Sequence, residues 1–324
     1  MDVSIVICTR NRCESLRSAL AAAAAVESRL AWEVVVVDNG STDSTRHVIA
    51  DAAERTPCIR SVFEAQKGLG AARDTGWRAA EGEIVAFTDD DCYLSPTFVD
   101  DLFRVFAEKP ELGFVGGRVL LHDPEDLPVT IDLRDAPEAV PCHRFLPAGT
   151  LQGANLSFRR LVLARLGGVD RGIGAGTPYP FEDIDLIAAA AWAGVKGIYD
   201  PRPTVSHHHR RRSHDFPMIL ADYDRGRGAY YMKYILRADS RLAYILGWIR
   251  KTRQTTGWRF PEVWEGLGRE FHSAWRWLGE RGSRLDQAIF SVPLLLGLLT
   301  TKVAAARLRS GDSGFRALAR LGWR

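Results

Sequence analysis

The chain has 324 residues, of which 46% are hydrophobic and 26% are charged, a composition typical of a folded globular protein. The net charge of +3 conceals an uneven distribution, with −10 over residues 1–200 and +13 over residues 201–324. The five cysteines are odd in number and form no CxxC pair, so they indicate neither a disulfide framework nor a zinc site. The basic half predicts attraction to an anionic partner, namely phospholipid headgroups, nucleic acid or lipid pyrophosphates.

Short apolar runs alternate with helical segments through the first hundred residues. This order predicts an α/β fold with a doubly wound, Rossmann-like, mostly parallel sheet flanked by helices. Because the first strand begins almost at the first residue, we expect no secretory signal and a cytoplasmic active site. The expected strands are Val3–Cys8, Glu33–Val37, Ile59–Glu64 and Ile84–Phe87. One helix is expected to begin at about Glu14, a second to end at about Glu54, and a third to cover Leu69–Ala80.

The pattern becomes less regular after residue 94. A long mobile loop is expected at Asp123–Pro147, which is rich in proline and aspartate. The other expected elements are a helix at Thr97–Ala107, a strand at Gly113–Leu121, ordered chain at Gly153–Phe158, short helices at Leu161–Leu166 and from Glu182, and strands at Val195–Tyr199 and Thr204–Ser206. We predict a catalytic domain over residues 1–212, with a nucleotide-binding half (1–95) and an acceptor-binding half (96–212).

Residues 213–324 are predicted to form a basic, mainly helical C-terminal region. Apolar residues recur at helical spacing from Phe260 to Leu278, either to pack on the rest of the protein or, together with Trp258 and neighbouring arginines, to lie at a membrane interface. Ile289–Leu299 is apolar, but Pro293 interrupts it and it is shorter than the roughly 20 residues of a spanning helix. We therefore expect this region to lie on or dip into a bilayer, without crossing it.

Acidic residues occur at three places that point to catalysis. Asp38 and the run Asp89–Asp91 follow apolar strands, and Glu182 and Asp183 begin a helix. Carboxyl ends of strands are where open α/β sheets bind ligands, and an unpaired buried carboxylate is costly. The run Asp89–Asp91 predicts a divalent cation site, with a solvated charge run as the alternative, and Asp38 predicts a contact to a base or ribose, with helix capping as the alternative.

Two further segments add basic and metal-binding groups. The sequence Lys67-Gly-Leu-Gly followed by Arg73 places N–H groups and cations at a helix start, where phosphate binds. Three consecutive histidines, 207–209, cannot all address one cation from a strand, because neighbouring side chains point to opposite faces. We favour His207 as the ligand, with His209 second and a purely basic surface segment third.

In order along the chain, VSIVICTRNR, EVVVVDNGSTDST, QKGLGAARDTGWRAAEGEIVAFTDDD, GANLSFRR and FEDIDL followed by TVSHH resemble the family 2 glycosyltransferases of GT-A fold. The resemblance covers about two thirds of the chain, up to His209. It implies inverting transfer from a nucleotide-diphosphate sugar with Mn²⁺ or Mg²⁺. The chain lacks the QxxRW motif of processive synthases, having Gln254-Thr-Thr-Gly-Trp258 instead, so we expect addition of a single sugar.

The resemblance also implies roles for individual residues. Asp183 matches the general base, with Glu182 binding acceptor hydroxyls or orienting Asp183, and Asp185 is expected on the helix surface or in a supporting position. Asp91, Asp89 and His207 match the metal site. Thr9, Asp38 and Arg73 match positions that contact or lie close to the nucleotide. Arg10, Lys67, Asp89 and Asp90 are also expected to bind the nucleotide.

The sequence thus predicts a membrane-associated enzyme at the inner face of the cell membrane. It would add one sugar, from a UDP-sugar by preference, to a glycan or lipid-linked saccharide in cell-surface polysaccharide biosynthesis. The alternatives are a catalytically silent nucleotide-sugar-binding scaffold and a sugar-phosphate nucleotidyltransferase, whose glycine-rich signature is lacking after the first strand. A nucleic-acid partner is not expected, because the basic residues of the C-terminal region alternate with apolar helical stripes.

Overall fold

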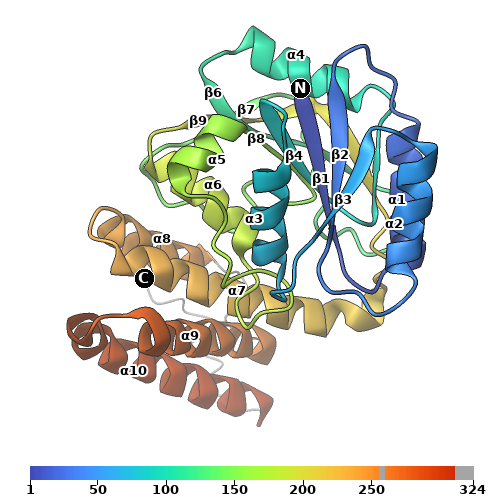
Figure 1. The fold of residues 1–324 in the computed structure, drawn as a ribbon. Helices are drawn as coiled ribbons and strands as arrows, with labels where there is room; N and C mark the ends of the chain where they lie inside the picture. Colours follow the sequence, from blue (N-terminus) through green and yellow to red (C-terminus); the bar gives the residue numbers. More distant parts are fainter. Residues whose placement is uncertain (255–259, 311–324) are drawn as a thin grey trace. The chain divides into compact units, whose positions relative to one another are not determined.

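The structure is a computed structural model that describes residues 1–254 and 260–310 (Figure 1). Of the Gln254–Trp258 segment considered above, residues 255–258 lie outside the described residues. The described chain divides into two compact units. The first contains residues 1–143, 148–177 and 182–215, and the second contains residues 144–147, 178–181 and those from 216 onward. The roles predicted for residues 1–95 and 96–212 stay predictions.

The first unit contains a nine-stranded sheet. Its first part consists of parallel neighbours in the order β3 (Ile59–Phe63), β2 (Trp32–Asp38), β1 (Val3–Thr9) and β4 (Ile84–Asp89). The sheet continues with β8 (Asn155–Arg159), β6 (Leu112–Leu121), β9 (Lys196–His207) and β5 (Cys92–Leu94), and β7 (Glu138–Val140) pairs with β9. Only β6 and β9 are parallel in this second part. The predicted α/β fold is confirmed.

Helices cover both faces of the sheet, which explains why its central strands are mostly apolar. Ile5 and Ile7 of β1 join one core with residues of α1 (Cys13–Ala24), α2 (Thr45–Arg55) and α4 (Phe98–Glu108). Their neighbour Val6 points to the other face, where α3 (Leu69–Ala79) packs at Gly76. A β-carbon on Gly76 would lie 2.4 Å from Val6 Cγ1, so the helix reaches the sheet only because this residue is glycine. The unit also contains α5 (Arg160–Leu166), α6 (Glu182–Trp192) and a short 3₁₀ helix at Ser213–Asp215.

The second half of this unit differs in detail from the prediction. The two short strands expected after residue 194 are one strand, β9, which continues through the prolines at 201 and 203. The Asp123–Pro147 segment is not entirely loop, because it contributes β7 to the sheet and Asp132 bridges to Val119. These pairings join residues from 13 to 61 positions apart, so no local sequence pattern predicts them.

The second unit is helical, as predicted. It consists mainly of α7 (Phe216–Leu236), α8 (Arg241–Gln254), α9 (Pro261–Arg281) and α10 (Arg284–Arg309), and α9 packs against both α7 and α10. The apolar stripe predicted along α9 is only partly buried: Leu267 and Leu278 are buried, whereas Phe260, just before the helix, and Trp275 are exposed. Trp277 is buried in place of Trp275.

The helix α10 corrects the expectation for Ile289–Leu299. That segment lies within a helix of 26 residues, and Pro293 is inside the helix and does not end it. By length and composition alone, α10 could cross a membrane, and only 22% of its most apolar window is buried within the structure. The expectation of a segment too short to span was therefore wrong. Packing of α10 against α9 along its length offsets the hydrogen bond that proline removes.

Candidate active site

Three predicted site residues are brought together by the register of the parallel strands. Thr9 is paired with Asp38 across β1 and β2, and Cys8 is paired with Asp89 across β1 and β4. Thr9, Asp38 and Asp89 therefore lie at neighbouring strand ends along one edge of the sheet. This is the position at which open α/β sheets bind ligands.

Asp90 and Asp91 are buried and held by an arginine from the loop after β1. Arg12 Nε lies 2.9 Å from Asp90 Oδ1, its Nη2 pairs with Asp91 Oδ2, and Thr9 Oγ1 donates a 2.7 Å hydrogen bond to Asp90 Oδ2. Burial raises the pKa of the Asp90 carboxyl to about 7, although Arg12 and Thr9 favour its ionised form. Asp90 thus supports the loop from within, and its protein partners already occupy both of its oxygens.

Asp89, Asp91 and His207, together with Cys92, form a candidate cation site. One ligand atom from each lies within 4.8 Å of all the others. Two carboxylates and an imidazole suit Mn²⁺ or Mg²⁺, whereas the buried Cys92 has its pKa raised well above the ordinary value and stays a protonated, poor ligand. The donor chemistry therefore fits the predicted metal.

The three histidines have different surroundings, and only His207 belongs to the strand β9, as its last residue. His207 Nε2 lies 3.2 Å from Asp91 Oδ1, and its Nδ1 lies 3.1 Å from Thr130 Oγ1. Although burial alone would lower the pKa of His207, Asp91 raises it. Both ring nitrogens of His209 contact backbone, Nε2 at 2.8 Å from the Leu127 carbonyl and Nδ1 accepting from Arg211 N–H. His208 is outside the Asp91 cluster, with its Nδ1 3.0 Å from the Tyr93 hydroxyl.

Arg73 links the metal cluster to the acidic pair on α6. Its buried guanidinium lies 3.2 Å from Asp89 Oδ1 and 3.5 Å from Glu182 Oε1, and it donates a 3.1 Å hydrogen bond to the Gly153 carbonyl. Burial raises the pKa of Glu182 to about 7, against the opposing charge of Arg73. Near neutral pH, the charge of Glu182 beside Arg73 therefore depends on pH.

Asp183 lies next to this group and remains partly exposed. Its Oδ1 accepts a 2.7 Å hydrogen bond from the N–H of Ile184. A β-carbon on Gly153 would lie 2.8 Å from Asp183 Oδ2 and 3.2 Å from Arg73 Nη1, so glycine is required for the close approach of both groups. Asp185 is buried, which excludes the helix-surface position considered for it.

The remaining predicted nucleotide-binding residues lie at or near the same edge. Asp38 Oδ1 accepts from Ser41 N–H at 2.8 Å, and Asp38 Oδ2 accepts from Arg46 Nε at 2.8 Å. These partners hold the pKa of Asp38 below its ordinary value, although burial opposes ionisation. Arg10 follows β1, and its buried Nε has no hydrogen-bond partner among the described residues. Lys67 is exposed in the loop before α3 and is not among the residues of the Arg73 cluster.

Sequence reasoning missed several residues that shape the site: Arg12, Arg46, Thr130 and Gly153. Arg12 pairs with acids 78 and 79 positions away, a separation that no local pattern reveals. Gly153 stands in the GANLSFRR block, but its role depends on the small space between Arg73 and Asp183. Arg46 could have been suspected, because it lies in the first turn of the helix that follows Asp38 and begins at Thr45.

Comparison with known proteins agrees with this geometry. Residues 4–160 match Glycosyl transferase family 2. These residues form a domain of this family. The resemblance stated from the sequence is confirmed over these residues.

Curated relatives of the chain match parts of its length. An uncharacterized glycosyltransferase of Nostoc sp. is 35% identical over 35% of each chain. The pre-mycofactocin glycosyltransferase of Mycobacterium tuberculosis is 29% identical over 68% of this chain and 46% of its own length. The glucosyl-dolichyl phosphate glucuronosyltransferase of Haloferax volcanii is 28% identical over 54% of this chain and 58% of its own. The chain thus spans between about one third and three fifths of the length of these relatives.

Solved structures share the fold at low sequence identity. The mannosyltransferase PcManGT of Pyrobaculum calidifontis, in complex with GDP-Man and Mn²⁺, has a TM-score of 0.59 at 21% identity, covering 99% of this chain and 87% of its own. TarS 1–349 of S. aureus, in complex with UDP-GlcNAc, has a TM-score of 0.60 at 16% identity, covering 96% and 92%.

Proposed function

We propose that the chain transfers one sugar, with inversion, from a nucleotide-diphosphate sugar to a hydroxyl of a glycan or lipid-linked saccharide. The observation that carries the proposal is the continuous arrangement at one sheet edge, in which buried Arg73 joins the Asp89 end of a cation-binding cluster to Glu182 and the adjacent Asp183. These are the groups that such a reaction needs: neutralisation of a diphosphate, and a carboxylate beside it.

The donor is bound along the strand ends. Asp38, fixed by Ser41 and Arg46, is placed to accept hydrogen bonds from a base or ribose, and the unpartnered Nε of Arg10 is a donor for an anionic group. The family neighbours include one structure with GDP-Man and one with UDP-GlcNAc, so nucleotide-diphosphate sugars are the appropriate class. We take UDP-sugars as the first donors to test.

Asp89, Asp91 and His207 would hold Mn²⁺ or Mg²⁺. When bound, the ion would neutralise the diphosphate of the donor and favour its departure. Arg12 keeps Asp91 oriented from the opposite side, and Thr130 fixes the ring of His207. Mn²⁺ is the first ion to test, because PcManGT was solved with it.

Asp183 serves as the general base. As the acceptor oxygen forms its bond to the anomeric carbon, the acceptor O–H proton passes to the Asp183 carboxylate, and the bond from the anomeric carbon to the phosphate oxygen breaks. The electron pair leaves with the nucleoside diphosphate. Glu182 orients this carboxylate or binds acceptor hydroxyls, while Arg73 offsets the negative charge of Glu182 and Asp89.

We place the enzyme at the inner face of the cell membrane, in cell-surface polysaccharide assembly. The net charge of +13 over residues 201–324 and the exposed leucines of α10 support this location. Sedimentation with anionic liposomes tests it. Leu296→Glu with Leu299→Glu should abolish pelleting, whereas the equally exposed Leu161→Glu in the first unit should not. Equal pelleting of both variants would exclude α10 as the anchor.

The function itself is tested by donor binding and turnover. Thermal unfolding of the purified protein is followed with UDP-, GDP-, dTDP- and CDP-sugars, each with and without Mn²⁺, and release of the nucleoside diphosphate is measured. We expect one nucleotide to raise the melting temperature in a Mn²⁺-dependent manner and to be turned over. A protein that binds no donor and releases no nucleotide in any combination would contradict the proposal.

A further inference from the structure

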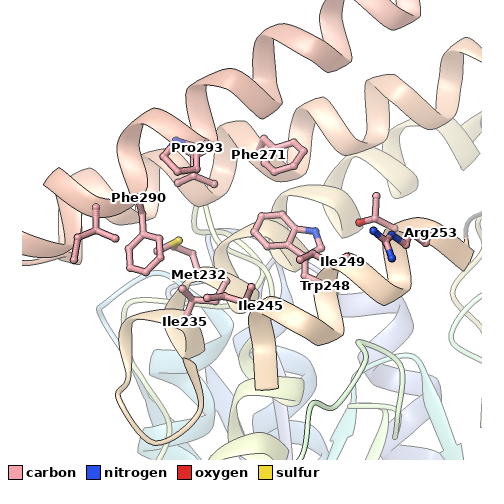
Figure 2. Close-up of a pocket in the computed structure, with 12 residues that line it drawn as sticks. Met232, Ile235, Ile245, Trp248, Ile249, Arg253, Phe271, Phe290 and Pro293 are labelled. Atoms are coloured by element: carbon pink, nitrogen blue, oxygen red, sulfur yellow. The ribbon is translucent and has the colours of Figure 1, made fainter. Parts of the chain in front are cut away.

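The helical unit contains a cavity of about 510 Å³ that the proposed reaction does not use (Figure 2). Its twelve lining side chains come from all four long helices of that unit, and ten of them are apolar. Protein interiors hold few voids larger than a water molecule, whereas small-molecule sites commonly measure about 300–1,000 Å³. The size therefore indicates a binding site more than a packing defect.

The chemistry of the lining excludes a sugar or a nucleotide as the occupant of the cavity interior. Trp248, Phe271 and Phe290 present rings to it, and the polar exceptions, Thr252 and Arg253, are neighbours on α8 (Figure 2). A hydroxyl or phosphate in the apolar part would lose its hydrogen bonds to water without replacement. A hydrocarbon chain has no such groups and gains from leaving water.

The cavity is continuous with an exposed apolar surface. Ile249 on α8 and Ile289 on α10 line it, yet they remain 46% and 48% exposed. From Ile289 the exposed apolar face continues along α10 through Val292, Leu296 and Leu299. A chain can thus enter from a bilayer in contact with this face without passing through water.

The second feature of the site is the positive charge of α8. The helix α8 carries Arg250, Lys251 and Arg253 in its last turns and has no acidic residue in its sequence. Arg253 lines the cavity next to Thr252, so a cation and a hydroxyl stand where the apolar lining ends. This combination suits a long hydrocarbon chain that ends in a phosphate.

We propose that the cavity between α7, α8, α9 and α10 binds the hydrocarbon chain of a phosphate-bearing lipid, with Arg253 facing the phosphate. Two sources share this chemistry, a polyprenyl phosphate and a membrane phospholipid. The inference does not depend on the proposed sugar transfer, because binding is measured directly and the sheet-edge residues have no part in it.

Photolabelling tests the site. The full-length protein is mixed with a polyprenyl phosphate or a phosphatidylglycerol, each carrying a diazirine in its hydrocarbon chain, and labelled peptides are mapped by mass spectrometry. Ile249→Trp fills the cavity from its rim, and Leu242→Trp is the matched control, because Leu242 is exposed on the same helix and does not line the cavity. Thermal unfolding and light scattering confirm that each variant is folded and show whether it self-associates.

We expect labels on the cavity-lining segments of α8 and α10, at least tenfold fewer in Ile249→Trp and no fewer in Leu242→Trp. Arg253→Gln should weaken binding of the phosphate lipid roughly fivefold, and Arg250→Gln should weaken it less. Competition by unlabelled polyprenyl phosphate or by unlabelled phospholipid identifies the source. Labels confined to exposed α10 residues, equal labelling of the two tryptophan variants, or occupation of the face by a second copy would each overturn the proposal.

Discussion

Gly153 is the residue whose role is most sharply fixed by geometry, and its replacement by alanine should impair catalysis far more than folding. The added methyl carbon would lie 2.8 Å from Asp183 Oδ2 and 2.9 Å from Asp183 Cβ, against an ordinary contact of at least 3.4 Å. The carboxylate must therefore withdraw by about 0.6 Å. Since misplacement of a catalytic group by about 1 Å can cost about 10²-fold in rate, we expect kcat to fall between about 10- and 100-fold.

The assay compares kcat for sugar transfer with the free energy of unfolding in urea. Overpacking should cost about 1–3 kcal/mol of stability. Gly279→Ala is the matched control, because no atom lies within 4 Å of its added carbon, and its rate should not change. In an Asp183→Asn background, Gly153→Ala should lower the residual rate less than threefold. A Gly153→Ala enzyme within threefold of the unmodified kcat, or an equal loss in both backgrounds, would refute the reasoning.

Three further outcomes are expected. Because burial raises the folded pKa of Glu182 to about 7, the folded state binds more protons than the unfolded state, so this group's contribution to stability falls by about 3 kcal/mol as the pH rises from about 4.5 to 7. Urea unfolding at pH 5 and 8 should show a smaller fall in Glu182→Gln, and equal falls would contradict the assignment. His207→Gln should weaken Mn²⁺ binding at least tenfold by calorimetry and His209→Gln should not; equal losses would exclude His207 as the particular ligand. Arg227→Ala should cost about 3–5 kcal/mol in thermal unfolding, because it leaves the buried carboxylate of Glu270 without its 2.6 Å partner, and a loss below 1 kcal/mol would show that the pair is not needed.

The strand ends show how far sequence reasoning reaches. Asp38 and Asp89 could be placed together because parallel strands put their carboxyl ends at one edge, and the register confirms that edge. Strand alternation was the reason for choosing one histidine among 207–209, but β9 ends at His207, so the alternation does not apply to the two histidines that follow.

Contacts between distant segments could not be predicted in this way. Arg12 reaches Asp91, and Thr130 reaches His207 from a segment predicted as a loop, because tertiary packing decides where loops turn. The same limit explains the error at Pro293. A proline weakens an isolated helix, but contact with α9 supports α10 on both sides of it.

The central claim is that Asp183 accepts a proton from the acceptor in sugar transfer. Its most direct test measures donor binding and product formation side by side for the unmodified protein and Asp183→Asn. The account predicts donor affinity within about threefold and transfer reduced by at least about 100-fold, because the isosteric amide cannot act as the base. Transfer by Asp183→Asn at the unmodified rate would contradict it.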